Sequence, residues 1–273
     1  MISIPHVERF PCLAEPSPGI DPRHIDAVAL DTDGVLTDSQ QLRIAAWGDA
    51  LHAFTAQYAR ATGHPWPVPT TSSGLITHLL GLLDEDIAAS LLRPAGHPVD
   101  LAADHLGPAE ADLRQLLACQ VDQRLAELLH SRGPSARPGA RALLLRLRAA
   151  GIATAAISTS RRAGEMLRHA GLGDLIDVSI DGQDAKHYRL AGPPHPGLLQ
   201  LALRLLHARP DRAALLADTA VVLEAGRLGA LGLVVAVDHR DTERAQLVGR
   251  HTPLVHGLDA IEVSPQRSTP VRT

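Results

Sequence analysis

The stretch IDAVALDTDGVLTD, residues 25–38, places an apolar run directly before two carboxylates and a glycine. Val28 and Leu30 alternate with small alanines, a pattern that suits a strand buried on both faces. Asp31 would then lie at the carboxyl end of this strand, the edge at which open parallel sheets bind their ligands. Gly34 lets the chain turn sharply and lets a ligand approach the backbone closely.

Asp31 and Asp33 are spaced i, i+2, so in an extended chain their side chains project to the same side. One carboxylate can attack an electrophile or hold a cation while the other gives or takes a proton. A strand followed by an Asx turn is the structural alternative, and the Asp-x-Asp-Gly pattern alone does not decide between the two. A calcium loop fits poorly, because Leu42 occupies the position where that loop needs a glutamate.

Composition limits the class of protein. The chain has 273 residues, of which 45% are hydrophobic and 2% aromatic, enough for one large domain or for a core with an inserted domain. No apolar run approaches the length of a membrane span, and residues 1–10 lack a signal-peptide pattern. The net charge of −4 argues against nucleic acid as the main ligand. Isolated Cys12 and Cys119 favour free thiols in a reducing cytoplasm.

The pattern changes along the chain. Five prolines before residue 25 indicate an extended leader, and residues 39–137 show helical periodicity without a convincing strand. Beyond this block, strands expected at 152–157, 178–180, 213–217 and 233–237 alternate with helices, and a loop is expected between residue 180 and Pro196. Such repeated units predict a parallel sheet with helices on both faces. The predicted division is a leader (1–24), a core (25–38 plus 138–262), a helical cap (39–137) and a mobile tail (263–273).

Three strand ends should meet at one edge of the sheet. They carry Asp31 with Asp33, Ser158 with Thr159, and Asp218. Hydroxyls and backbone N–H groups at a helix N-terminus bind anions, but adjacent carboxylates repel phosphate unless a divalent cation intervenes. Metal-assisted phosphoryl transfer follows. The structural alternative for the Ser-Thr-Ser segment, a simple helix cap, stays open.

A family resemblance supports the chemical interpretation. The string DTDGVLTDS, residues 31–39, with Ala46-Trp47 downstream, resembles motif one of the haloacid dehalogenase-like phosphotransferases, most closely the β-phosphoglucomutase branch. Residues 223–235 are similar to the segment that follows motif four of that family. The resemblance spans roughly residues 25–240 and implies an α/β fold, a Rossmann-like parallel-sheet core with an inserted helical cap that closes over the site.

The resemblance also implies roles for the matching residues. Asp31 matches the nucleophile that forms an aspartyl-phosphate. Asp33 matches the general acid/base, whose backbone carbonyl is also a metal ligand. Ser158 matches the hydroxyl that holds the transferring phosphoryl group, and Asp218 matches a metal ligand of motif four. We therefore expect phosphate to be bound by Ser158, Thr159 and Gly34, and Mg²⁺ by Asp31, Asp33 and Asp218.

Two motifs depart from the family pattern. Pro193 stands where motif three carries a lysine, whose positive charge lies between nucleophile and phosphate. Lys186 and Arg161 are the candidates to replace it. Motif four has Ala217 and Val222 at the two positions where relatives place a further acid.

The substrate-binding features depart as well. Arg43 occupies a position on the helix that bears a histidine in the mutase branch, and the loop at 69–74 lacks the arginine expected to grip a distal phosphate. Arg43, Arg161 and Lys186 are candidate substrate or anion contacts, although Arg161 and Arg162 equally suit a solvated helix start. Because a mutase needs a second phosphate grip, simple hydrolysis is the easier chemistry to retain.

The leading hypothesis is a cytoplasmic, Mg²⁺-dependent phosphatase or phosphomutase, monomeric or homodimeric. Its substrate would be a small phosphorylated metabolite such as a sugar phosphate, and neither nucleic acid nor a membrane would be a partner. The alternative, motivated by Pro193, Ala217 and Val222, is a catalytically weak or inactive relative that binds a ligand or protein.

Overall fold

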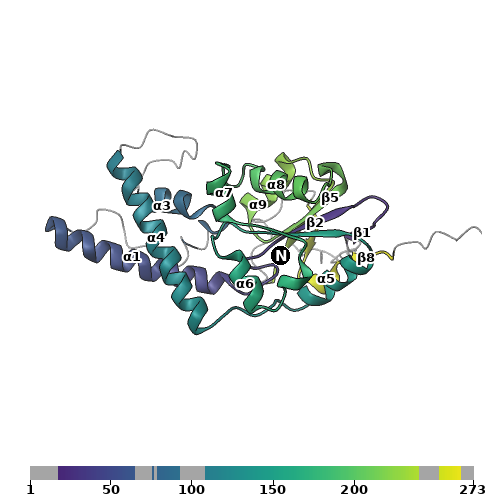
Figure 1. The fold of residues 1–273 in the computed structure, drawn as a ribbon, viewed down its shortest axis with the longest axis horizontal. Helices are drawn as coiled ribbons and strands as arrows, with labels where there is room; N and C mark the ends of the chain where they lie inside the picture. Colours follow the sequence, from purple (N-terminus) through teal and green to yellow (C-terminus); the bar gives the residue numbers. More distant parts are fainter. Residues whose placement is uncertain (1–17, 65–75, 77–78, 93–107, 240–251, 266–273) are drawn as a thin grey trace, which may run out of the picture.

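The computed structural model describes residues 18–64, 76, 79–92, 108–239 and 252–265 (Figure 1). The predicted leader up to residue 17, the loop at 69–74 and the tail from residue 266 lie outside the described residues. Within the described part of the chain, no helix combines the length and apolarity that crossing a bilayer requires.

A six-stranded parallel sheet forms the centre of the molecule, with β2 between β3 and β5. Every residue of β2 and β5 is buried, which fits the aliphatic residues and alanines that make up both strands, apart from Asp31 at the carboxyl end of β2. In sheet order the strands are β4 (Val178–Ile180), β3 (Ala153–Ile157), β2 (Ala27–Asp31), β5 (Ala213–Ala217), β6 (Leu233–Val237) and β7 (Leu254–Val255).

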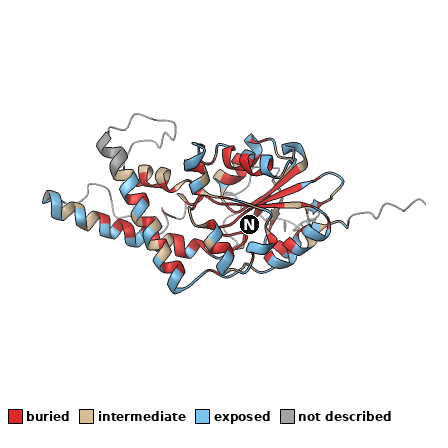
Figure 2. Cartoon of the chain, viewed as in Figure 1, coloured by how far each residue is buried: buried red, intermediate tan, exposed pale blue. Residues whose placement is uncertain are grey.

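Helices cover both faces of this sheet, and Figure 2 shows the central strands buried between them. Alternate residues of β2 point to opposite sides: Val28 and Leu30 belong to one hydrophobic cluster, and Ala29 belongs to another. The first cluster includes residues of α5 (Ala140–Ala149) and α6 (Ala163–His169). The second includes residues of α8 (Gly197–Leu205) and α9 (Ala220–Leu228).

Three further helices form a helical module beside the sheet (Figure 1): α1 (Gln40–Thr62), α3 (Asp84–Leu92) and α4 (Pro108–Ser131). They pack around a hydrophobic cluster of their own, in which Trp47, Ile87 and Leu117 are fully buried. The chain enters this module immediately after the acidic turn that follows β2. The module therefore lies next to the carboxyl edge of the central strand.

The structure differs from the sequence prediction in its shortest elements. Residues 182–187, predicted as loop, form the helix α7 (Gly182–His187). Asp181 caps the N-terminus of this helix, because its side chain accepts a hydrogen bond from the Gln183 N–H at 2.8 Å. Within the predicted leader, Gly19–Ile20 form the strand β1, which pairs in parallel with β8 (Glu262–Val263). Ile20 is fully buried, so this segment contributes to the hydrophobic core.

Candidate active site

The acidic residues lie at the carboxyl edge of the sheet, as their position after β2 requires. Asp31 pairs in register with Ile157 of β3, so Ser158 follows at the same level of the sheet. On the other side, Leu30 pairs with Leu216, which places Asp218 just beyond the end of β5. Asp31, Asp33, Ser158, Thr159 and Asp218 are all buried, each less than a tenth exposed.

A tight turn after β2 fixes the second carboxylate. Backbone N–H groups of Leu36 and Thr37 donate to the carbonyls of Asp31 and Thr32 at 3.1 and 3.0 Å. Gly34 has φ +88°, a conformation that glycine adopts at least cost. A Cβ at this position would also collide with the Asp218 carboxylate and the Gln40 side-chain amide. The glycine is therefore required both by the turn and by the close approach of Asp218.

Asp33 is held by hydroxyl groups from two elements. Ser158 Oγ donates to Asp33 Oδ2 at 2.7 Å, and Ser39 Oγ donates to Asp33 Oδ1 at 2.6 Å. The backbone N–H of Asp33 points to Asp31 Oδ1 at 3.3 Å. The two carboxylates thus lie together in different environments, an arrangement that can divide nucleophilic from acid–base work.

The surroundings of Asp31 disfavour its ionised form. Burial, followed by the negative charges of Asp218 and Asp33, raises its pKa well above the ordinary value, and Arg43 opposes that rise. Positive charge brought to this edge would stabilise the ionised form of Asp31. The site is therefore suited to a cation or to a positively charged side chain.

The donor set fits Mg²⁺ by its chemistry. Within the described residues no group of three or more Asp, Glu, His or Cys side chains could hold a metal ion, so a cation at this edge would have at most two such ligands. Asp31 and Asp218 are close enough for their negative charges to repel one another. Mg²⁺ is commonly bound by one or two carboxylates with water and phosphate oxygens completing its coordination. The Gln40 side-chain amide donates to Asp218, while its buried Oε1 has no hydrogen-bond partner. An unpaired oxygen beside a carboxylate is itself a suitable neighbour for a cation.

Arg43 lies inside the cluster rather than at its rim. Its side chain is 2% exposed, and Nη1 lies 3.5 Å from Asp33 Oδ2 and 3.3 Å from Thr159 Oγ1. Its Nη2 donates to Asp84 Oδ1 of α3 at 3.1 Å. Burial raises the pKa of Asp84 to about 6, although the Arg43 charge acts against that rise.

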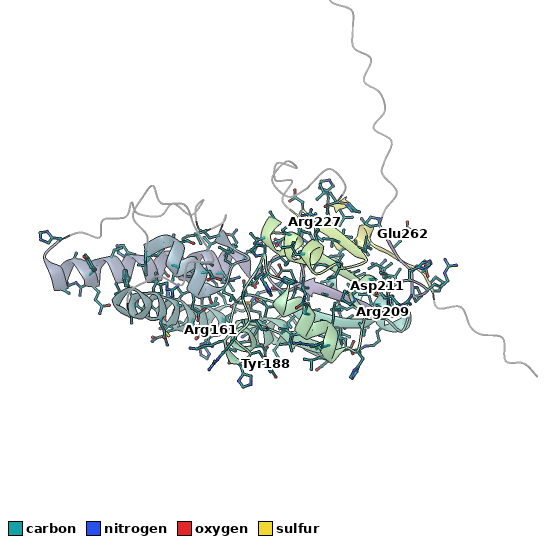
Figure 3. All side chains as sticks on the ribbon, turned by 90° about the horizontal axis from the view of Figure 1, so that it is seen from above. Arg161, Tyr188, Arg209, Asp211, Arg227 and Glu262 are labelled. Atoms are coloured by element: carbon teal, nitrogen blue, oxygen red, sulfur yellow. The ribbon has the colours of Figure 1, made fainter. Side chains whose placement is uncertain are left out.

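The other predicted cations lie elsewhere. Lys186 is exposed on α7, so its ammonium is not part of the buried cluster. Arg161 forms an ion pair with Glu85 of α3, and Figure 3 shows it where the helical module meets the sheet. Arg162 pairs with Asp122 of α4 at 2.8 Å. Both arginines thus join the core to the helical module.

The positions that depart from the expected motifs lie against the same cluster. Pro193 and Val222 line a cavity of about 10 Å³, together with Asp31. That volume holds about one water molecule. The other lining residues are mostly apolar: Ile157, Ser158, Thr159, His195, Leu198, Leu199 and Ala225. The wall of the site behind Asp31 is therefore largely apolar, with Pro193 where a lysine was expected.

A family model for haloacid dehalogenase-like hydrolases matches residues 25–229. The chain therefore belongs to the haloacid dehalogenase-like hydrolase family, and the predicted family, fold class and enzyme class are confirmed.

Relatives point to the same branch. A β-phosphoglucomutase of Mycobacterium bovis is 30% identical over 248 residues, which cover 88% of this chain and 90% of that protein. The structure of β-phosphoglucomutase from Clostridium difficile aligns with a TM-score of 0.66 at 18% identity, covering 86% of this chain and 92% of that one. CbbY from Rhodobacter sphaeroides, solved in complex with phosphate, aligns with a TM-score of 0.61 at 21% identity, covering 86% and 95%. At these identities the two structures show the fold alone.

Proposed function

We propose that this protein is a cytoplasmic, Mg²⁺-dependent phosphatase that transfers the phosphoryl group of a small sugar phosphate to Asp31 and then to water. The observation that carries the proposal is the buried cluster of Asp31, Asp33 and Ser158 at the carboxyl edge, with Asp218 beside it. The 30% identical β-phosphoglucomutase of Mycobacterium bovis supports a sugar phosphate as the substrate class.

The residues divide the reaction between them. A carboxylate oxygen of Asp31 attacks phosphorus, the bond to the substrate oxygen breaks, and protonated Asp33 gives its proton to that oxygen. Ionised Asp33 then takes a proton from water, which attacks the aspartyl-phosphate and releases inorganic phosphate and free Asp31. The Ser39 hydroxyl keeps Asp33 oriented through both steps, and the single proton of the Ser158 hydroxyl, which is donated to Asp33 in the free site, becomes available to a phosphate oxygen when substrate binds.

Ser158 and Thr159 begin the segment that leads to α6, where hydroxyls and backbone N–H groups suit phosphate oxygens. Mg²⁺, held by Asp31 and Asp218 with the Asp33 backbone carbonyl, would offset the negative charge shared by the carboxylates and the phosphate. Hydrolysis is favoured over mutase chemistry, because a mutase needs a second grip for a distal phosphate.

The experiment is phosphate release from a panel of sugar phosphates and an aryl phosphate, with Mg²⁺ or EDTA. Wild type is compared with Asp31→Asn and with the matched control Asp26→Asn, which alters a carboxylate paired with Arg212 at the surface. We expect release that EDTA abolishes, that Asp31→Asn lacks and that the control retains. Absence of release from every substrate would overturn the proposal and favour a binding protein built on this fold.

A further inference from the structure

A site that brings a phosphate beside buried carboxylates needs nearby positive charge. Phosphoryl transfer gathers negative charge on the phosphoryl oxygens, and preorganised cationic groups stabilise that charge. In this chain Pro193 stands at the position expected to supply a lysine, and it borders an apolar cavity next to Asp31. Any replacement must therefore enter the site from another direction.

The described structure offers one arginine in contact with the cluster itself. Arg43 Nη1 and Ser158 Oγ approach the same oxygen, Asp33 Oδ2, at 3.5 and 2.7 Å. The same Nη1 lies 3.3 Å from Thr159 Oγ1. Arg43 therefore lies between the acidic turn and the loop after β3, where a phosphoryl group on Asp31 would be bound.

A second carboxylate, that of Asp84, binds the other terminal nitrogen of this arginine. Asp84, buried on α3, accepts from Nη2 at 3.1 Å. A guanidinium presents several N–H groups in a rigid planar fork, so one edge can be fixed while another faces a ligand. The Arg43 charge also lowers the pKa of Asp31, against the larger rise caused by burial and the neighbouring carboxylates.

We propose that Arg43 replaces the missing lysine: its guanidinium binds the transferring phosphoryl group, and Asp84 is the positioning residue that aims it. This inference rests on the proposed phosphatase function. The positive charge that motif three normally supplies would come from Arg43 on α1, a different element of the chain. This substitution would explain how a proline can be tolerated at position 193.

The test is steady-state kinetics of Arg43→Gln and Arg43→Lys on the best substrate of the panel. Arg60→Gln is the matched control, since Arg60 is exposed near the end of the same helix. We expect kcat to fall about 100-fold or more in Arg43→Gln and less in Arg43→Lys, with Arg60→Gln unchanged. Wild-type kcat in Arg43→Gln would overturn the inference while leaving the proposed function intact.

A buried aspartate left without its arginine can prevent folding, so Arg43→Gln/Asp84→Asn, which neutralises both partners, is the second variant. Asp84→Asn alone should lower kcat about tenfold in the wild-type background and cause no further loss in Arg43→Gln, because Asp84 acts through Arg43. Equal losses in both backgrounds would overturn the positioning role.

Chemical rescue separates chemistry from structure. Millimolar guanidinium should restore part of the kcat of Arg43→Ala without changing its melting temperature, and rescue absent at every concentration would count against a direct role. If the wild type releases no phosphate, the proposed function fails, and the role of Arg43 is then tested by the affinity of the protein for a phosphate mimic. Equal affinity of wild type and Arg43→Gln for tungstate, used as a phosphate mimic, would then overturn the inference.

Discussion

The Ser158 hydroxyl donates a 2.7 Å hydrogen bond to Asp33 Oδ2 across 125 residues of sequence. The contact exists because β2 and β3 are adjacent parallel strands whose carboxyl ends coincide. Ser39 holds the other oxygen of the same carboxylate at 2.6 Å. Asp33 is thus oriented from two sides before any substrate arrives, as preorganised acid–base catalysis requires.

Ser158→Ala should lower kcat by about 100-fold, because it removes the hydroxyl that orients Asp33 in the free site and that would donate to a phosphate oxygen in the complex. Steady-state phosphate release measures the effect. Ser160→Ala is the control: Ser160 is also buried, but its Oγ accepts only a long, 3.4 Å bond from the Arg162 N–H. Equal losses in both variants would show that the segment, rather than the Ser158 hydroxyl, is what matters.

Gly34→Ala should abolish activity and destabilise the fold. The new methyl group would meet the Asp218 carboxylate and the Gln40 amide, and φ +88° is strained for any residue with a Cβ. Gly48 is the contrast, since a Cβ there meets nothing within 4 Å in the exposed face of α1. Gly48→Ala should raise the free energy of unfolding by about 0.5–1 kcal/mol. Urea unfolding of both variants tests the pair, and an active, stable Gly34→Ala would contradict the geometry.

The sequence predicted the central strands well for a physical reason. β4, β5 and β6 have the predicted bounds. β5 and β6 are short apolar runs between turn residues and are mostly buried, whereas β4 is a three-residue edge strand with an exposed serine. The elements β1, β7 and β8 contain two residues each, too few for any periodicity to appear. α7 has six residues, and its local signals are Asp181 and Asp184, which form a capping box, and the basic residues Lys186 and His187 in its last turn.

The site was predictable only where topology decides it. Asp31, Asp33, Ser158 and Asp218 follow strands that are neighbours in a parallel sheet, so their proximity follows from the order of elements. The contact between Arg43 and Asp84 joins two helices 41 residues apart, and no local pattern encodes it. The sequence marked Arg43 as a candidate anion contact but gave no indication that it is buried among the carboxylates.

The pKa of Asp84 predicts a pH dependence of stability. Burial raises it from 3.8 to about 6, so the folded protein binds this proton more tightly than the unfolded chain does. Ionisation of Asp84 therefore lowers the free energy of unfolding as the pH rises from about 4 to 6, by about 3 kcal/mol in total. Relative to Asp84→Asn, which cannot titrate, the wild type should be most favoured below pH 4 and lose that advantage above pH 6.

Urea unfolding of wild type and Asp84→Asn at intervals between pH 4 and 7 measures this difference. Asp49→Asn, which changes an exposed carboxylate of α1 paired with Arg124, should give a curve that follows the wild type within a few tenths of a kcal/mol. A difference between wild type and Asp84→Asn that stays constant with pH would contradict the raised pKa.

Asp218 should couple metal binding to folding. A ligand that binds only the native state stabilises it by about 2.7 kcal/mol at a hundredfold excess over its Kd. Mg²⁺ together with a phosphate mimic should therefore raise the melting temperature of the wild type by several degrees. In Asp218→Asn the increment due to Mg²⁺ should be lost, because a neutral amide replaces one of the two carboxylates available to the cation.

Thermal unfolding with Mg²⁺ alone, tungstate alone and both together separates the contributions. Asp211→Asn, a change at an exposed carboxylate paired with Arg209, should keep the full increment. Since the Gln40 amide donates to Asp218, Gln40→Ala should weaken the Mg²⁺ increment without abolishing it. An undiminished increment in Asp218→Asn would remove Asp218 from the metal site and leave Asp31 as the principal carboxylate for the cation.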